Sequence, residues 1–213
     1  MRTRIKICGI TRPADALTAA AAGADAIGLV FYPDSPRYIR PEEARALIRM
    51  MPPFIAVVGV FFDATEAAVS EVVETVPVHI LQFHGDETPE YCTAWSRPYL
   101  KGIRMRDNAD LTREAKRFSS ARALLVDTYA REHPGGTGKP FDWNRVKGEL
   151  ALPLILAGGL TAENVGTAIQ EVHPYAVDVS SGVESEKGIK DSRKIAHFVQ
   201  AVRRADGTVK PSR

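Results

Sequence analysis

The stretch LPLILAGGLTAENVGTAIQEVHPYAVDVSSGV, residues 152–183, shows the pattern that decides the fold. A short apolar run ends in two glycines, a segment of helical character follows, and a second short apolar run, YAVDVSS, comes next. A strand, a crossover helix and a second strand in this order make a βαβ unit, in which successive βα units build a parallel sheet. The same unit recurs along the whole chain.

Eight short and largely apolar runs are expected to be strands: RIKICGI from Arg4, AIGLVF from Ala26, IAVVGVF from Ile55, HILQFHG from His79, YLKGIRM from Tyr99, ALLVDT from Ala123, LPLILAGG from Leu152 and YAVDVSS from Tyr175. Helices are expected over residues 14–22, 41–51, 64–75, 88–95, 110–118, 142–150, 162–172 and 191–203. Eight βα units in one chain of this length favour a single closed (β/α)8 TIM barrel over a doubly wound open sheet, which usually needs five or six strands.

Helix start and stop signals agree with several of these segments. Gly23 follows the first helix as a left-handed stop, and Pro41 opens the second. Thr161 and Asp191 are expected at N-cap positions. We expect the α/β barrel to span residues 1–205 and residues 206–213, which have no apolar period, to be a frayed tail.

Composition and charge exclude several classes of protein. Of 213 residues, 45% are hydrophobic and 25% charged, as in an ordinary globular domain. The 28 Lys and Arg residues against 26 Asp and Glu give a formal net charge of +2, and the basic residues are spread along the chain. Because nucleic-acid binding needs a basic patch, no nucleic-acid partner is expected.

The two cysteines, Cys8 and Cys92, allow at most one disulfide. No Cys-x-x-Cys motif and no Cys/His pair stand at zinc-ligand spacing, so we expect no metal site and a reduced, cytoplasmic location. The longest apolar run, residues 54–62, is far shorter than the ~20 residues that span a bilayer. No membrane partner is expected.

The ends of the seventh and eighth strands carry the clearest ligand signal. In a TIM barrel the chemistry collects at the carboxyl ends of the strands, and the last two loops recurrently bind phosphate. LAGGL at residues 156–160 and SSGV at residues 180–183 place small residues where backbone N–H groups can approach an anion. The alternative is that these glycines only make tight turns. The predicted phosphate-binding residues are Gly158, Gly159, Ser180, Ser181 and Gly182.

Cys8 is a candidate catalytic residue because it ends the first strand. Side chains alternate along a strand, so Lys6 and Cys8 share a face and point into the barrel if Ile5 and Ile7 pack outward. A lysine beside the thiol favours the thiolate, which can act as a base or nucleophile. The alternative is an inert buried thiol, and this is the interpretation we keep for Cys92.

Four further polar residues are candidates for the same site. Asp127 ends an apolar strand, where an acid is costly unless it is paired or catalytic, and it could instead simply pair with Lys6. Asp178 likewise is either part of the site or a structural ion-pair partner, and the structural role is favoured. His84 either contacts a ligand or ends its strand with a polar cap. Arg37, in the SPRY loop, either binds an anionic group of the substrate or is merely solvated.

The motifs around these residues resemble those of the phosphoribosylanthranilate isomerase family. The resemblance covers about residues 4–199, in which motifs occur in order at seven of the eight strand ends. Phe83 stands where the family more often has leucine. The motifs are KICGITR (6–12), GLVFYPDSPRYI (28–39), VGVF (58–61), LQFHGDE (81–87), LLVDT (124–128), LAGGL (156–160), DVSSGVE (178–184) and GIKD (188–191).

The resemblance implies an Amadori rearrangement in tryptophan biosynthesis. N-(5-phosphoribosyl)anthranilate would become 1-(2-carboxyphenylamino)-1-deoxyribulose 5-phosphate, with neither cofactor nor metal. By the same resemblance, Cys8 is the general base, Asp127 is the general acid and Arg37 holds the anthranilate part. The phosphate would bind backbone amides near Gly159 and residues 180–182. His84 and Asp178 remain candidate substrate-binding residues.

The reaction needs one acid and one base. The acid protonates the ring oxygen as the furanose opens, and the base then removes the C2 proton. Two rival functions remain: a related phosphosugar isomerase or epimerase, which would need a second interior aspartate or His/Asp metal ligands, and a barrel that only binds phosphorylated ligands. The sequence does not decide between a monomer and a homodimer.

Overall fold

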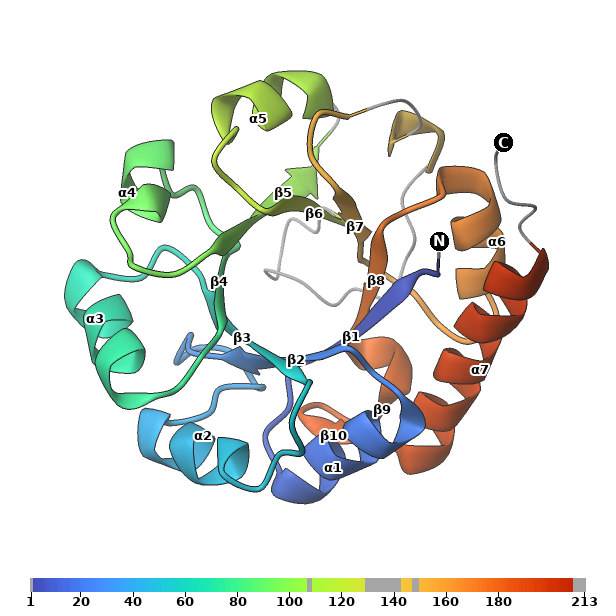
Figure 1. The fold of residues 1–213 in the computed structure, drawn as a ribbon, viewed down its shortest axis with the longest axis horizontal. Helices are drawn as coiled ribbons and strands as arrows, with labels where there is room; N and C mark the ends of the chain where they lie inside the picture. Colours follow the sequence, from blue (N-terminus) through green and yellow to red (C-terminus); the bar gives the residue numbers. More distant parts are fainter. Residues whose placement is uncertain (1, 107–108, 129–142, 147–149, 209–213) are drawn as a thin grey trace.

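The computed structural model describes residues 2–106, 109–128, 143–146 and 150–208, and it shows a closed ring of parallel strands with helices outside it (Figure 1). Each strand pairs with the next along the chain, and β8 pairs with β1. The expected (β/α)8 barrel is confirmed. Its strands are β1 (Arg4–Cys8), β2 (Ala26–Val30), β3 (Ala56–Phe61), β4 (Ile80–Phe83), β5 (Tyr99–Met105), β6 (Ala123–Thr128), β7 (Leu154–Leu156) and β8 (Ala176–Val179).

Seven α-helices cover the outside of the ring within the described residues: α1 (Pro13–Ala22), α2 (Pro41–Ile48), α3 (Glu66–Thr75), α4 (Pro89–Thr93), α5 (Leu111–Arg117), α6 (Val165–Val172) and α7 (Ser192–Thr208). Between β6 and β7 the described residues form a short 3-10 helix, η1 (Trp143–Val146), and the rest of the helix expected over 142–150 lies largely outside the described residues. None of the described helices is long and apolar enough to cross a membrane.

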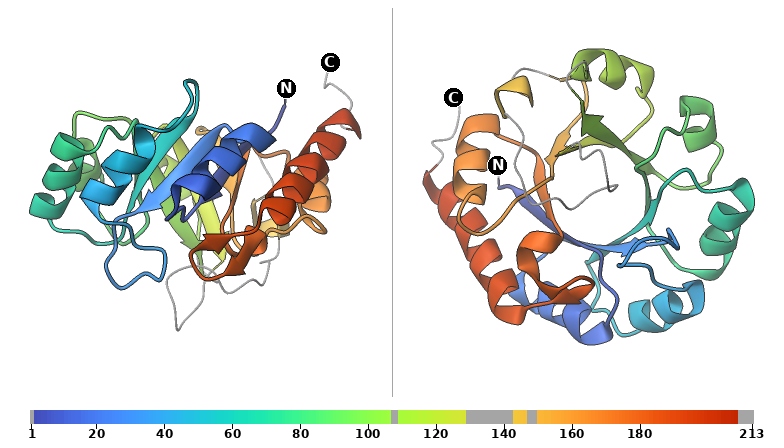
Figure 2. Two further views of the ribbon diagram at one scale, coloured as in Figure 1. Left: turned by 90° about the horizontal axis from the view of Figure 1, so that it is seen from below. Right: turned by 180° about the vertical axis from the view of Figure 1, so that it is seen from behind.

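A small element after β8 was not expected from the sequence. A 3-10 turn, η2 (Ser181–Val183), leads into a two-stranded antiparallel hairpin of β9 (Glu184–Glu186) and β10 (Ile189–Lys190). The hairpin precedes α7 and lies at the same end of the barrel as the carboxyl ends of the strands (Figure 2).

Most of the expected helix ends are confirmed. Gly23 has a φ of 102° after α1, Pro41 begins α2, and the Asp191 carboxylate accepts backbone N–H bonds from the first turn of α7. The expected cap at Thr161 is wrong, because α6 begins at Val165 and residue 164 is its N-cap. The side-chain oxygen of Asn164 instead bonds back to the backbone N–H of Thr161.

The predicted boundary between the barrel and a frayed tail, at residue 206, is too early. Helix α7 continues to Thr208, and the Asp206 carboxylate accepts hydrogen bonds from the backbone N–H and the hydroxyl of Thr3. This contact fastens the end of the last helix to the start of the first strand, and it explains why helical order outlasts the apolar pattern. Residues 209–213 of the expected tail lie outside the described residues.

Alternation along the strands divides the core into two layers. Ile5 and Ile7 belong to the large apolar layer between the sheet and the helices. A smaller apolar cluster fills the inside of the ring: Val58, Val60, Leu100, Ala123, Leu125, Ile155, Ala157 and Ala176. Because side chains fill the interior, the barrel is not an open pore, and only its two ends are available for chemistry.

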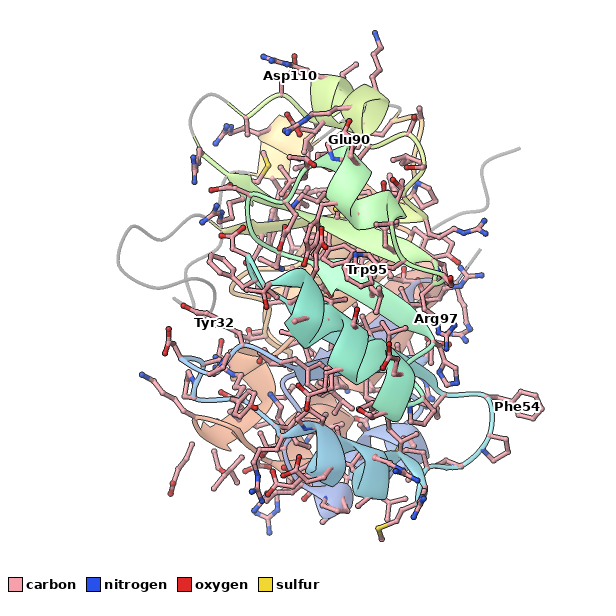
Figure 3. The ribbon with its side chains drawn as sticks, turned by 90° about the vertical axis from the view of Figure 1, so that its left-hand side faces the viewer. Tyr32, Phe54, Glu90, Trp95, Arg97 and Asp110 are labelled. Atoms are coloured by element: carbon pink, nitrogen blue, oxygen red, sulfur yellow. The ribbon has the colours of Figure 1, made fainter. Side chains whose placement is uncertain are left out.

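The two ends of the barrel differ in what they carry. Tyr32 follows β2 at the carboxyl-end rim, whereas Phe54 precedes β3 at the opposite rim (Figure 3). The start of β1 and the end of α7 lie at that opposite rim (Figure 2). The carboxyl-end rim is therefore the place to look for a site.

A buried ion pair stabilises the wall of the barrel. Lys101 on β5 lies 2.7 Å from Glu87, and each side chain is only 3% exposed. Lys101 also donates to the carbonyl of Gly85, and the Glu87 carboxylate accepts backbone N–H bonds from Asp63 and Gly85. The pair ties the loop after β4 to the neighbouring strand.

Replacing Glu87 with glutamine should destabilise the fold strongly. The change leaves the Lys101 ammonium buried without a counterion, which typically costs about 3–5 kcal/mol of unfolding free energy. Urea denaturation followed by circular dichroism measures the loss. Glu43→Gln is the control, because its pair with Arg40 is largely exposed and should contribute little. Equal losses in the two variants would contradict the interpretation.

Candidate active site

One cavity at the carboxyl ends of the strands gathers nine of the ten predicted site residues. Gly182 is the exception: its backbone packs so closely on the Leu160 carbonyl that a Cβ would collide with it. The predicted residues that line the cavity are Cys8, Arg37, His84, Asp127, Gly158, Gly159, Asp178, Ser180 and Ser181. Residues far apart in the chain thus converge as the sequence predicted, although their roles are not thereby tested.

Lys6 forms a buried ion pair with Asp178 across the seam between β1 and β8. Its ammonium lies 2.9 Å from the carboxylate, and the two side chains are 5% and 8% exposed. The two residues are direct partners in the β1–β8 register. The alternative that Asp127 pairs with Lys6 is therefore wrong. Burial alone would lower the pKa of Lys6, but the charges of Asp178 and Cys8 outweigh it and the pKa is raised.

The Cys8 thiol lies beside Lys6 and opposite a glycine. Gly28 is its partner in the β1–β2 register, and a Cβ there would come within 2.7 Å of the sulfur and 3.1 Å of the Lys6 ammonium. Only glycine leaves room for both groups. Burial raises the pKa of Cys8, Lys6 lowers it and Asp178 raises it, with a net rise. Lys6 thus acts in the predicted direction without overcoming burial.

Asp127 belongs to a short chain of polar side chains. Its Oδ2 lies 3.5 Å from Nε2 of His84, and Nδ1 of His84 lies 2.9 Å from the Gln82 amide nitrogen. With the amide placed in this way, Gln82 donates to Nδ1, so the proton of a neutral imidazole sits on Nε2 and faces Asp127. His84 is therefore more than a polar cap on its strand.

Arg37 is not a solvated loop residue. Its Nε and Nη2 donate to the two carboxylate oxygens of Glu184 at 2.8 and 2.7 Å, and its side chain is only 14% exposed. A two-pronged pair of this kind fixes both the position and the plane of the guanidinium. The charged group is thus held at the cavity wall.

The loops after β7 and β8 form the remaining wall of the cavity. Gly158 and Gly159 have φ values of 84° and 65°, so two consecutive residues adopt the left-handed region, which favours glycine. Ser180 and Ser181 begin the short turn after β8. Small residues in both loops leave backbone groups accessible from the cavity.

Several cavity residues were missed by the sequence analysis. Tyr32 and Phe62 follow β2 and β3, and their ring centroids are 5.2 Å apart. Ser35 and Gln82 also line the cavity, and Glu184 holds Arg37 from behind. The signal for Tyr32, Phe62 and Gln82 was their position at strand ends. Nothing in the sequence pairs Glu184 with a residue 147 positions earlier.

The described residues contain no group of three or more His, Cys, Asp or Glu side chains that could hold a metal ion. The cavity instead offers one thiol, carboxylates, an imidazole and cations. These groups can move protons and bind an anion.

Comparison with known proteins agrees with this geometry. The model of a family described as N-(5'phosphoribosyl)anthranilate (PRA) isomerase matches residues 5–201. A relative from Pseudomonas putida (strain GB-1), called N-(5'-phosphoribosyl)anthranilate isomerase, is 54% identical over 202 residues, which cover 95% of this chain and 98% of the relative. The chain belongs to the phosphoribosylanthranilate isomerase family.

Solved structures of phosphoribosylanthranilate isomerases share the fold. The enzyme from Thermus thermophilus is 36% identical with a TM-score of 0.85, and the alignment covers 95% of this chain and 99% of that one. A further member, 38% identical with a TM-score of 0.76 over 94% of this chain and 98% of its own, was solved with reduced 1-(o-carboxyphenylamino)-1-deoxyribulose 5-phosphate.

Alkylation of Cys8 should need a higher pH than an ordinary thiol requires. Only the thiolate reacts, and burial raises the Cys8 pKa, so the rate with iodoacetamide should reach half its maximum above the ordinary value of roughly 8.5. Lys6→Met should move this midpoint still higher, because it removes the cation that lowers the pKa. Mass spectrometry of the labelled peptide measures the rate.

Cys92 provides the internal control for this experiment. It is fully buried in α4, and burial raises its pKa to about 12. It should stay unlabelled while Cys8 reacts. A midpoint for Cys8 below that of a free thiol, or a downward shift in Lys6→Met, would refute the electrostatic account.

Proposed function

We propose that this protein catalyses the Amadori rearrangement of N-(5-phosphoribosyl)anthranilate to 1-(2-carboxyphenylamino)-1-deoxyribulose 5-phosphate, a step of tryptophan biosynthesis. The observation that carries the proposal is that the Cys8 thiol and the Asp127 carboxyl line one cavity. They come from β1 and β6, which are three places apart in the ring. Membership of the isomerase family supports the same reaction.

In the proposed mechanism Asp127 is the general acid and Cys8 is the general base. Asp127 protonates the ring oxygen as the C1–O bond breaks and an iminium ion forms. Cys8 then takes the proton from C2, which gives an enolamine that tautomerises to the ketone. A positioned acid or base typically contributes 10²–10⁴-fold each. Asp127 gives the substrate one proton and Cys8 removes one, so the product has the same atoms as the substrate.

The number of protons that Cys8 and Asp127 hold together agrees with the raised pKa of Cys8. The reactive form, a thiolate with a protonated carboxylic acid, holds one proton in total. A neutral thiol with a carboxylate holds the same number, so the two forms interconvert without net proton uptake. His84, which lies between Gln82 and Asp127, is placed to influence the acid rather than the base.

The two ends of the substrate are assigned to different groups that line the cavity. Arg37, a fixed cation, would bind the anthranilate carboxylate. The phosphate would bind backbone amides of the loops at Gly158, Gly159, Ser180 and Ser181, whose small side chains allow close approach. A solved family member that binds a reduced, phosphorylated product analogue supports a small phosphorylated ligand. Holding both ends fixes the sugar between acid and base.

The proposed function also implies a cellular compartment and a class of partner. A biosynthetic enzyme with two free cysteines in the described residues suits a reducing cytoplasm. The evenly spread charge argues against a nucleic-acid partner. A related phosphosugar isomerase of the kind that needs a second interior aspartate is disfavoured, because β1 ends in Cys8.

Turnover and its loss in two variants test the proposed function. Phosphoribosylanthranilate formed in situ should lose its fluorescence when the protein is added. Cys8→Ser and Asp127→Asn should each lower kcat by about 10²-fold or more, the contribution of a positioned acid or base. Steady-state fluorescence at equal protein concentration measures this effect.

Cys92→Ala is the matched control for the loss of a thiol, because Cys92 is buried in α4 and lies outside the cavity. It should keep its turnover. An absence of turnover in the unmodified protein with a verified substrate would favour a barrel that only binds phosphorylated ligands. Full activity in both Cys8→Ser and Asp127→Asn would refute the assigned acid and base.

A further inference from the structure

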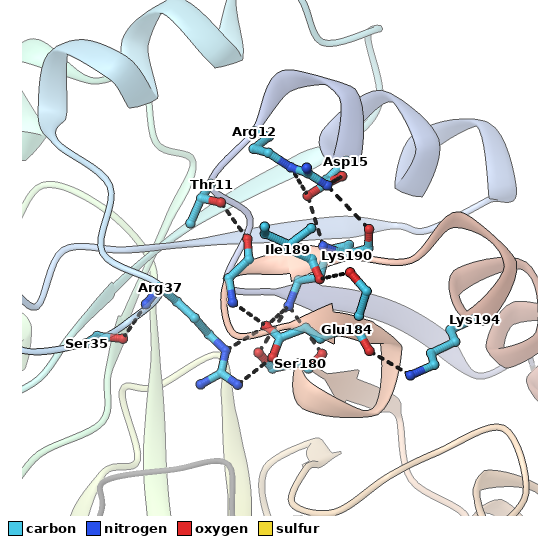
Figure 4. Close-up of polar contacts among 12 residues, drawn as sticks. Thr11, Arg12, Asp15, Ser35, Arg37, Ser180, Glu184, Ile189, Lys190 and Lys194 are labelled. Atoms are coloured by element: carbon cyan, nitrogen blue, oxygen red, sulfur yellow. Dashed lines mark hydrogen bonds and ion pairs between the residues drawn. The ribbon is translucent and has the colours of Figure 1, made fainter.

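Glu184 on the β9–β10 hairpin is the centre of a buried polar network (Figure 4). Its carboxylate accepts two hydrogen bonds from Arg37, one from the Lys190 ammonium at 2.7 Å and one from the Gly188 backbone N–H at 3.3 Å. The Glu184 side chain is 6% exposed and that of Lys190 is 0% exposed. Glu184 itself does not line the cavity, so it can act on a ligand only through its partners.

Lys190 extends the network to the loop after β8. Its ammonium donates to the Ser180 carbonyl at 3.2 Å and to the Ser180 hydroxyl at 3.3 Å. Ser180 lies in the loop to which the phosphate is assigned, and Arg37 lies at the wall assigned to the anthranilate carboxylate. One carboxylate therefore links the two ends of the proposed substrate site.

The network is tightly packed around Gly9. A Cβ on Gly9 would lie 2.5 Å from Cδ of Arg37 and 3.0 Å from the Ser180 hydroxyl oxygen, and the φ of Gly9 is 73°. Any residue other than glycine at this position would therefore displace Arg37 or Ser180. Arg37 and Ser180 pack side by side against Gly9.

The hairpin that carries Glu184 is fastened to the first βα unit. The Lys190 backbone N–H donates to Asp15 at 3.1 Å, and the Thr11 hydroxyl donates to the Gly188 carbonyl at 2.6 Å. The Lys194 ammonium donates to the Glu184 carbonyl at 2.7 Å. These bonds give Glu184 a rigid base, which a positioning role requires.

The charges of the network leave Arg37 available to a ligand. Burial would raise the pKa of Glu184, but Arg37 and Lys190 outweigh it and the pKa is lowered, so the carboxylate stays ionised. Glu184 occupies the Nε and Nη2 edge of the guanidinium, and Nη1 has no partner among the described residues. Arg37 is the cation of this network that lines the cavity.

We propose that Glu184 is a positioning residue that sets the selectivity of this site for a ligand with both a carboxylate and a phosphate. It holds Arg37 directly and the Ser180 loop through Lys190, so one residue of the hairpin positions both groups that would bind the ligand's anionic ends. The inference rests on the proposed function, because that function assigns the carboxylate to Arg37. Glu184 transfers no proton and touches no reacting atom.

The test compares Glu184→Gln with Glu186→Gln, an exposed glutamate on the same hairpin. Calorimetry measures the binding of reduced 1-(o-carboxyphenylamino)-1-deoxyribulose 5-phosphate and of the same compound without its ring carboxylate. Glu184→Gln should weaken binding of the first by about 10-fold or more, the value of a hydrogen bond to a charged group, and of the second by less than about 3-fold. Glu186→Gln should change neither.

Kinetics provide a second readout. Glu184→Gln should raise KM with little change in kcat, because it removes binding of a part of the substrate remote from the reacting atoms. In an Arg37→Met background, Glu184→Gln should have a much smaller effect on binding, since Arg37, its direct link to the ligand carboxylate, is already lost. A purely structural role would instead weaken both ligands equally and add to the effect of Arg37→Met.

Each outcome decides the proposal. If Glu184→Gln does not fold, Glu184→Asp keeps the negative charge in the network while shortening the side chain that holds Arg37, and it should show the same selective loss. Equal weakening of both ligands, or unchanged binding, overturns the positioning role. Absence of turnover in the unmodified protein overturns the proposed function alone, because the binding comparison still reports on Glu184. Binding of neither ligand by the unmodified protein overturns both.

Discussion

The ion pair between Lys6 and Asp178 is the interaction on which the site depends. It lies where the last strand closes on the first, and both groups are nearly inaccessible to water. An unpaired charge at this depth is costly, so the pair requires Lys6 to face inward. A slip of β1 by one residue would turn Lys6 outward and take Cys8 with it. Closure of the barrel and orientation of the thiol are therefore one constraint.

The interior of the barrel separates stability from chemistry along its axis. Apolar side chains fill the middle of the ring, and inward positions toward the carboxyl ends carry Cys8, His84 and Asp127. The strand framework fixes these groups rigidly, whereas the charges that would grip an anionic ligand come from loops and from the β9–β10 hairpin. Such a division lets the loops determine which ligand binds while the strands keep acid and base in place.

The sequence predicts the parts of this structure that follow local rules. Strand alternation correctly placed Lys6 and Cys8 inside the ring, and the repeat of βα units correctly predicted its closure. Alternation also turns both Asp127 and Asp178 inward, so it could not tell which of them meets Lys6. Only the register between β1 and β8 selects Asp178, and register is a property of the assembled sheet.

The features that were missed or wrong involve contacts between distant parts of the chain. The partner of Arg37 lies in a hairpin whose short strands have no clear periodicity. The last turns of α7 depend on Asp206 meeting Thr3, which no local pattern shows. The close packing of Gly182 on the Leu160 carbonyl likewise joins two loops that no local pattern connects. In each case tertiary packing decides among options that the sequence leaves equal.

A crystal structure of the protein with reduced 1-(o-carboxyphenylamino)-1-deoxyribulose 5-phosphate would test the account most directly. We expect the Cys8 sulfur to lie within about 3.5 Å of C2 of the sugar chain, a near-attack distance. We also expect the Asp127 carboxyl to lie within hydrogen-bond reach of the oxygen on C4, with the phosphate between the loops after β7 and β8. A ligand bound with its phosphate at Arg37, or with the thiol and the carboxyl on the same face of the sugar, would contradict it.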